Sequence, residues 1–317
     1  MSIQNYFRQG FIAASILSLA GLLSPAVTAQ VEAYTPTNVA ERNNLYCAGY
    51  VQSSEINTER RLIGAVEEQD GFLYSQNNEV YINAGANRGV SVGDVFSIIR
   101  PRGQVKTRWT SKNNLGQYVQ EVGTVEVFSV KSEYSVARVK SSCDNLLLGD
   151  LVHVWQERTS PRYVERAALD RFADPSGKAR GRLFMARDGQ EMITRDQIVY
   201  VDLGAEDNVK AGDYLTIYRP LGKGNILKGP PESQAARTEG YQSLTYKGGR
   251  FSNQAARKKG ENARGLVVTT ENAKKDRPDI RKVVGEAVVL NVKEKTATVV
   301  ITRTAQEIHT GDWVEIQ

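Results

Sequence analysis

Apolar and polar residues alternate with a period of two along several short stretches of this 317-residue chain. Val80 and Ile82, for example, alternate with Tyr81 and Asn83. This pattern is typical of a strand that buries one of its faces. Turn residues interrupt the runs at intervals of about eight to twelve residues, which predicts a small antiparallel barrel or sandwich. We therefore expect an all-β, mainly antiparallel fold.

Two copies of this strand pattern occur in the chain. Val80–Pro101 aligns without a gap to Val199–Pro220, which lies 119 residues later, and ten of 22 positions are identical. Gly123–Trp155 aligns in the same way to Gly285–Gln317, which lies 162 residues later. The larger spacing places 43 additional residues inside the second copy. The sequence therefore predicts an internal duplication into two tandem β domains. A duplicated module favours a binding or structural role over a catalytic one.

The segments between and around the copies complete the predicted organisation. Ser160-Pro161 precedes the sequence RYVERAALDRF, a pattern typical of a short helix with serine at its N-cap. Residues 221–282 contain few large apolar side chains, which predicts a long flexible insertion. The expected parts are a signal peptide at 1–29, an N-terminal segment with one strand at 30–60, a first β domain at 61–158, a linker with a short helix at 159–180, and a second β domain at 181–317 that contains the insertion.

Glycine and aspartate recur at corresponding turns of the two copies. Gly89 is replaced by Asn208 in the second copy, and both residue types tolerate a positive φ. An aspartate after glycine at the start of a strand can accept hydrogen bonds from local backbone amides. We assign structural turns to Gly85, Gly89, Gly93, Asp94, Gly149, Asp150, Gly204, Asn208, Gly212, Asp213, Gly311 and Asp312.

The first 29 residues have the pattern of a secretory signal peptide. Arg8 is the only charged residue before an apolar run at Phe11–Leu23, and the tripeptide VTA before Gln30 resembles a cleavage site. The run is shorter than the roughly 20 apolar residues of a membrane span. An uncleaved anchor helix is the alternative. We expect export to the periplasm or outer envelope of a bacterium, with no transmembrane span in the mature chain.

The chain contains two cysteines, Cys47 and Cys143. An exported protein meets an oxidising compartment, which favours a disulfide between them. Two separate buried thiols are the alternative, because the sequence does not give the distance between their Cα atoms.

The net charge of +5 comes from the insertion. Leu221–Lys282 holds 14 lysines and arginines against six aspartates and glutamates. Basic residues interleaved with aromatic ones can bind a polyanion through charge and stacking, whereas the alternative is a solvated loop that its own charge extends. The candidate contact residues are Lys247, Arg250, Phe251, Arg257, Lys258 and Lys259.

We assign no catalytic or metal-binding site to the sequence motifs. The two histidines, His153 and His309, have no partner at the spacing of a zinc site. The letters G-x-S-x-G occur once, at Gly89–Gly93, but an expected strand follows them, whereas the nucleophile turn of a hydrolase leads into a helix. The G-K-[ST] ending of a phosphate-binding loop is absent. We therefore expect no enzyme activity, no metal and no cofactor. A cell-wall hydrolase that uses aspartate and glutamate is the less favoured alternative.

One pattern resembles a known family. The sequence Gly85-x-x-x-Gly89-Val90-x-x-Gly93-Asp94, followed by a strand and Arg100-Pro101, is similar to the C-terminal domain of flagellar assembly protein T. The resemblance implies a small β-domain in a periplasmic protein of the flagellar motor. The chain shows no equivalent of that family's N-terminal and middle domains, so the resemblance implies the domain more securely than the motor role.

These observations together predict a non-enzymatic envelope protein that serves as a structural, assembly or binding module. The expected partners are other envelope proteins, as in a flagellar or secretion apparatus. Binding to peptidoglycan or to anionic surface polymers is the alternative. Nucleic acid is not expected as a partner, because the chain carries an export signal.

Overall fold

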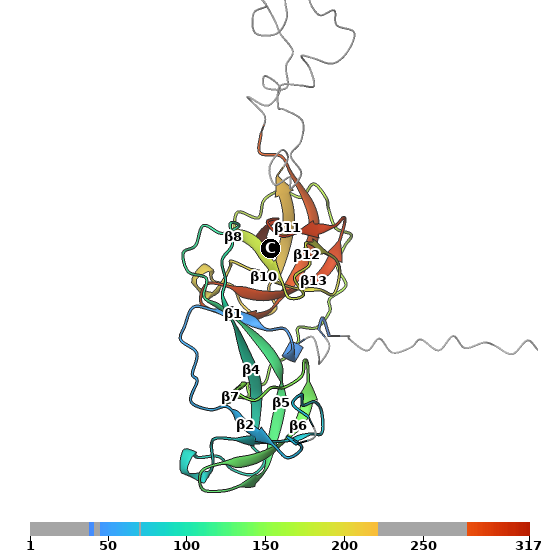
Figure 1. Cartoon of the computed structure of the whole chain (residues 1–317). Helices are drawn as coiled ribbons and strands as arrows, with labels where there is room; N and C mark the ends of the chain where they lie inside the picture. The colour runs from blue at the N-terminus through green and yellow to red at the C-terminus, as the bar shows by residue number, and fades with distance from the viewer. Residues whose placement is uncertain (1–37, 41–44, 70, 221–277) are drawn as a thin grey trace, which may run out of the picture. The chain divides into compact units, whose positions relative to one another are not determined.

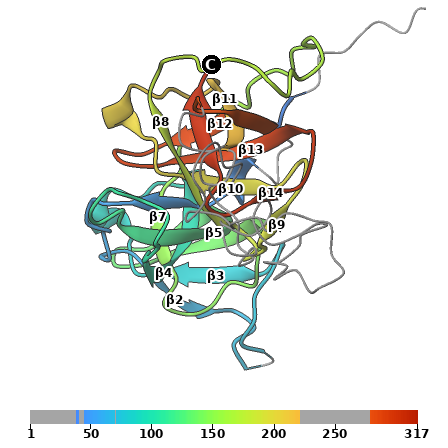
Figure 2. The same cartoon turned by 90° about the horizontal axis from the view of Figure 1, so that it is seen from above.

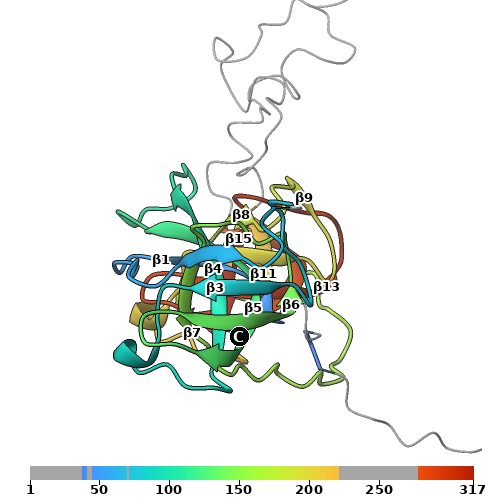
Figure 3. The same ribbon diagram turned by 60° about the horizontal axis from the view of Figure 1, so that its bottom comes forward.

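The first β unit is a rolled antiparallel sheet in the computed structural model, which describes residues 38–40, 45–69, 71–220 and 278–317. Its strands are β1 (Tyr50–Gln52), β2 (Leu62–Ala65), β3 (Glu79–Ile82), β4 (Val95–Gln104), β5 (Gln117–Val130), β6 (Ser135–Ser142) and β7 (Leu151–Val154). The sheet order is β2-β3-β6-β5-β4-β7, and β1 pairs with β5 outside this path (Figures 1 and 3). A bridge between Arg61 and Leu151 links the two ends of the path.

The second β unit is a closed antiparallel barrel with the order β10-β13-β12-β11-β15-β8. Its strands are β8 (Arg180–Ala186), β9 (Met192–Ile193), β10 (Ile198–Val201), β11 (Tyr214–Pro220), β12 (Arg281–Val292), β13 (Ala297–Thr304), β14 (Ile308–His309) and β15 (Trp313–Ile316). The short strands β9 and β14 form a separate ladder (Figure 2). The predicted all-β antiparallel class is therefore confirmed, and the second unit takes the barrel form.

Corresponding strands pair in the same register in the two units. Phe96 on β4 faces Val125 on β5, and Leu215 on β11 faces Ala287 on β12. These positions differ by the same 119 and 162 residues that align the sequences. The register shift between Ile98 and Ile99 likewise recurs on β11. The paired positions of β4 and β5 from Val95 to Pro101 therefore have defined counterparts on β11 and β12.

The alternating apolar residues fill one core in each unit. Val80 and Ile82 are fully buried inside the first sheet, where they pack with residues such as Val125 and Ala137. Val199 occupies the place of Val80 in the second core. This burial follows from the period of two, which directs every second side chain inward.

A third cluster joins the N-terminal segment and the β4–β5 connection to the outer face of the second barrel. It contains Ala48 and Val51 of the segment, Leu115 of the connection, and Phe184 and Tyr200 of the barrel. The Tyr200 hydroxyl donates a hydrogen bond to the Ala48 carbonyl oxygen at 2.6 Å. The described residues accordingly belong to one compact unit that contains both sheets. The predicted strand of the N-terminal segment begins at Tyr50, after Gly49 with its positive φ.

The predicted linking helix is wrong. No helix forms between Ser160 and Ala179. Ser160 does not cap a helix, because its hydroxyl oxygen accepts a hydrogen bond from the Ala40 amide, 120 residues away. The carbonyl oxygens of the linker bind outward as well: Ala167 accepts from Arg303, and Arg171 accepts from the Val283 amide. An isolated helix of this length is marginal in water, and its apolar Phe172 is 78% exposed, so tertiary contacts override the local propensity.

The boundary of the basic insertion also differs from the prediction. β12 begins at Arg281, which pairs with Pro220, so the last two residues of the predicted insertion belong to the barrel. Within the described ranges, the chain forms no helix that is long and apolar enough to cross a membrane.

Candidate functional site on the outer wall of the second barrel

The sequence-predicted contact residues cannot be placed. Lys247, Arg250, Phe251, Arg257, Lys258 and Lys259 lie outside the described residues, and so does the predicted signal peptide. The insertion therefore remains a prediction.

The predicted turn residues lie in tight turns before strands. Gly89 and Asn208 both adopt the left-handed conformation, with φ values of 72° and 63°. Asp94 accepts a hydrogen bond from the Ser91 amide at 2.8 Å, and Asp213 accepts one from the Lys210 amide at 2.8 Å. Close approach of neighbouring backbone explains the glycine at position 85, where a Cβ would lie 2.3 Å from the Lys131 carbonyl oxygen. The remaining glycines with positive φ among these positions are Gly93, Gly149, Gly212 and Gly311.

Two of the turn aspartates have a second role that the sequence reasoning missed. Asp150 binds Arg100 at 2.7 Å, and Asp312 binds Arg219 through both of its carboxylate oxygens, also at 2.7 Å. Both carboxylates are buried, and hydrogen bonding to each raises the pKa of its arginine partner. The arginine of the recurrent Arg-Pro at the end of the repeated motif was the sequence feature that could have predicted these ion pairs. These ion pairs fasten β4 to β7 and β11 to β15, which is a structural role.

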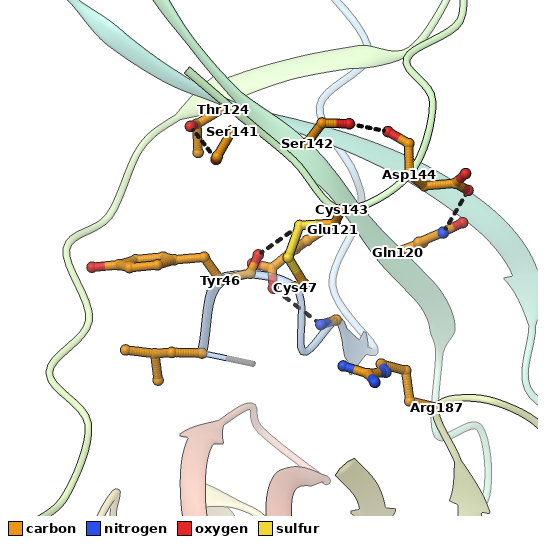
Figure 4. The surroundings of a disulfide bond; sticks show 12 residues. Tyr46, Cys47, Gln120, Glu121, Thr124, Ser141, Ser142, Cys143, Asp144 and Arg187 are labelled. Atoms are coloured by element: carbon orange, nitrogen blue, oxygen red, sulfur yellow. Dashed lines mark hydrogen bonds between the residues drawn. A yellow bond between two sulfur atoms is a disulfide. The ribbon is translucent and has the colours of Figure 1, made fainter. Parts of the chain in front are cut away.

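The predicted disulfide is confirmed. Cys47 and Cys143 are bonded, with their Cα atoms 5.6 Å apart (Figure 4). The bond ties the N-terminal segment to the end of β6, and Glu121 of β5 supports the same segment by accepting a hydrogen bond from the Gly49 amide at 3.0 Å. Glu121 also pairs with Arg158. The segment is thus held against the first sheet by one covalent bond and by a buried carboxylate.

The segment that the disulfide holds covers an apolar wall on the outside of the first sheet. Ile99 of β4, Val119 of β5 and Leu151 of β7 form this wall, which we call the first wall. Tyr50 packs on it as part of β1, and Ile56 adds a partly buried contact. Burial raises the pKa of Tyr50 to about 12. The first wall is therefore closed by the chain's own residues.

The corresponding wall of the second barrel has different chemistry. The strand registers place Tyr218 where Ile99 stands, Arg281 where Val119 stands, and Trp313 where Leu151 stands; we call these three residues the second wall. Tyr218 and Trp313 stack with ring centroids 6.3 Å apart and an interplanar angle of 20°. The Arg281 guanidinium lies 4.7 Å from the Tyr218 ring centroid. Two aromatic side chains and one cationic side chain thus occupy the positions that aliphatic side chains occupy in the first wall.

A buried ion pair supports the second wall. Arg281 binds Glu315 at 2.7 Å, and the two side chains are only 8% and 5% exposed. Arg281 also donates to the carbonyl oxygens of Ala173 and Asp174 in the linker, and Glu315 accepts from the Ser176 amide at 3.2 Å. The linker therefore runs along the edge of this wall and fixes the guanidinium in one position.

Two further arginines surround the tryptophan. The Arg182 guanidinium lies 4.1 Å from the Trp313 ring centroid, and the Arg180 guanidinium lies 5.6 Å from it. Burial lowers the pKa of Arg182. Burial raises the pKa of Tyr218, while Arg180 and Arg281 act in the opposite direction by stabilising its charged form. Arginine over an aromatic face is a favourable arrangement, worth roughly 0.5 to 2 kcal/mol.

A hollow of about 410 Å³ opens over the second wall. Besides Tyr218, Arg281, Trp313 and Glu315, it is lined by Pro175, Gly177, Lys178, Arg180, Pro220 and Asp279. The partly exposed Trp313 ring offers apolar contact, and Lys178 and Arg180 offer hydrogen bonds and charge, whereas Tyr218 is buried beneath them. These side chains have the chemistry to contact an anionic group. No group of three potential metal ligands occurs among the residues that the structure describes.

The fold defines a protein with two antiparallel β units that have equivalent strand order and register. Comparison with known families finds a match for part of the first unit. Residues 77–154 match the family model of flagellar assembly protein T, C-terminal domain, which confirms the resemblance found in the sequence. The match spans β3 to β7 of the first unit. No curated protein matches the chain.

Proposed function

We propose that this protein is an exported, non-enzymatic envelope protein that acts as a structural or binding module of a flagellar assembly. The observation that carries the proposal is the match of residues 77–154 to the C-terminal domain of flagellar assembly protein T. That family is associated with the bacterial periplasm. The disulfide between Cys47 and Cys143 supports the location, because such bonds persist in oxidising compartments.

The matched region offers a surface for a protein partner. Val92 is 67% exposed and Phe128 is 42% exposed, and both line one shallow hollow next to Arg138 and Lys140. Exposed apolar side chains with a polar rim are typical of protein contact sites. The partner in this proposal is another component of the flagellar assembly.

Copurification with flagellar basal bodies tests the assembly role. We expect the tagged full chain to copurify from the bacterium that produces it, and the double variant V92D/F128D to reduce the recovered amount at least fivefold. V164D is the matched control, because Val164 is similarly exposed but lies in the linker outside the matched region. If the wild-type chain does not copurify, or if both variants behave alike, the proposal is wrong.

A fusion of alkaline phosphatase to the C-terminus of the chain tests export separately, because this enzyme becomes active only after it leaves the cytoplasm. We expect activity that is lost when residues 2–29 are deleted. Activity that is absent from the intact fusion would contradict the proposed location.

The second candidate function is binding of peptidoglycan or anionic surface polymers. The basic and aromatic second wall favours it, since such side chains suit a negatively charged polymer. Sedimentation with purified peptidoglycan, with neutral chitin as the control polymer, checks this candidate.

A further inference from the structure

The second wall has the features of a ligand site rather than those of a structural wall. Both walls are built on strands that pair in the same register, so the backbone does not dictate their chemistry. The first wall is aliphatic and covered by β1. The second wall carries Tyr218, Arg281 and Trp313 beneath a hollow of about 410 Å³. A volume of this size lies within the range of pockets that bind small molecules.

Stability alone does not explain the buried ion pair of the second wall. Replacing a buried ion pair by apolar side chains of similar volume is often neutral or stabilising, and the first wall demonstrates an apolar solution on the same backbone. The pair does fix the guanidinium of Arg281 beside the hollow. The same guanidinium donates to the Ala173 and Asp174 carbonyl oxygens, so the pair also holds the linker at the rim of the hollow.

The cations at the rim of the hollow remain available to a ligand. Arg180 is exposed, and within the described residues no carboxylate lies within ion-pair distance of it. Lys178 is also exposed and donates one hydrogen bond to the Gln317 main-chain oxygen, so two N–H groups of its ammonium remain for a ligand. Both residues flank the stacked aromatic rings, because they line the same hollow as Trp313.

We propose that this hollow binds a sugar unit that bears a carboxylate or a phosphate. The charged group of the ligand meets Lys178 and Arg180, while the body of the sugar contacts Trp313, Pro175 and Pro220. A bare anion would use the cations alone and would leave the rings and prolines without a contact. The inference deepens the second candidate function given above, and it is independent of the match to the flagellar family.

Binding of single sugars to the purified full chain tests the inference. The probes are glucuronic acid, N-acetylmuramic acid, glucose 6-phosphate and neutral N-acetylglucosamine, and the readouts are saturation-transfer NMR and quenching of tryptophan fluorescence. We expect at least one of the acidic sugars to bind at least tenfold more tightly than the neutral sugar. The first two probes report a carboxylate ligand and the third reports a phosphate ligand.

Variants locate the binding. K178A/R180A should weaken the binding of the acidic sugar at least tenfold, and W313L, which introduces the leucine of the first wall, should weaken it by a similar factor. K106A/K131A is the matched control, because it removes the same charge from exposed positions outside the hollow and should bind like the wild type. Circular dichroism verifies that each variant is folded.

Several outcomes of these binding experiments would contradict the proposed sugar site. Equal binding of acidic and neutral sugars, equal loss in the two double variants, or binding of acetate and inorganic phosphate as tight as that of the sugars overturns the inference. Tighter binding of an acidic peptide such as Gly-Glu-Glu also overturns it, since the hollow would then serve a protein. Copurification of K178A/R180A with basal bodies is measured in parallel, because an unchanged yield separates a failure of this inference from a failure of the flagellar proposal.

Discussion

The first and second walls occupy equivalent places on two sheets with the same strand order and register. The first wall uses Ile99, Val119 and Leu151 and is covered by a segment that a disulfide holds in place. The second wall uses Tyr218, Arg281 and Trp313 and has a hollow above it. The comparison teaches that one β scaffold can use the same surface either for apolar packing under a covering strand or as the floor of a hollow. The fold itself does not require the aromatic and cationic side chains.

Removal of the disulfide should produce the largest effect, because it frees the cover of the first wall. The bond joins residues that are 96 positions apart, and the chain-entropy model assigns a crosslink of this size about 4.7 kcal/mol. We expect C47S/C143S to lower the free energy of unfolding by roughly this amount, measured by urea denaturation. Hydrogen exchange of the β1 amides should accelerate, while that of β11 and β15 should change less.

Reduction of the wild-type protein provides the control for this experiment. It should reproduce the loss of stability, and the reductant should have no effect on C47S/C143S. Unchanged exchange at Tyr50–Gln52 would mean that the packing of Tyr50 alone holds the cover.

Conversion of the second wall toward the first should have a smaller effect. R281V introduces the valine of the first wall and leaves Glu315 buried without its cationic partner, which should cost about 3 kcal/mol. The double variant R281V/E315L removes both charges, and we expect it to recover at least half of this loss. Urea denaturation of the two single variants and the double variant completes the thermodynamic cycle. A double variant less stable than R281V would show that apolar packing does not suit this wall.

Patterns that act over a few residues were predictable from the sequence. The alternation around Val80 and Ile82, and the shared tolerance of Gly89 and Asn208 for a positive φ, depend on local geometry, and the strands and turns formed accordingly. The two cysteines were also informative, because the chain holds only one possible pair.

Features that depend on distant contacts were not predictable. The linker sequence has helical propensity, yet Arg281, Arg303 and Val283 of the barrel use its carbonyl oxygens instead. The second wall was missed because Tyr218, Arg281 and Trp313 come from three separate strands, and only the pairing of β11 with β12 and β15 brings them together. Arg281 also falls within the predicted insertion, although it belongs to β12.

The smallest effect that we predict concerns another position at which the units differ in charge. Asn83 accepts a hydrogen bond from the Arg61 amide at 2.7 Å, and Asp202 accepts the equivalent bond from the Arg182 amide. Asp202 is buried and also accepts from the Thr110 hydroxyl at 2.7 Å. Burial raises the pKa of Asp202 above its usual value, and the hydrogen bonds oppose this effect only in part.

The variant D202N, which installs the asparagine of the first unit, should therefore change how stability depends on pH. A carboxyl group with a raised pKa in the folded state favours folding most below its unfolded pKa, and this contribution is lost as the pH rises through the folded pKa. The wild type should thus gain stability relative to D202N as the pH falls from 7 toward about 4. If the pKa of Asp202 differs by one between the folded and unfolded states, the free energy of unfolding changes by about 1.4 kcal/mol across this pH range. Urea denaturation of both proteins at each pH measures the change, and a gap that is constant or that moves in favour of D202N at low pH would show that burial does not dominate at Asp202.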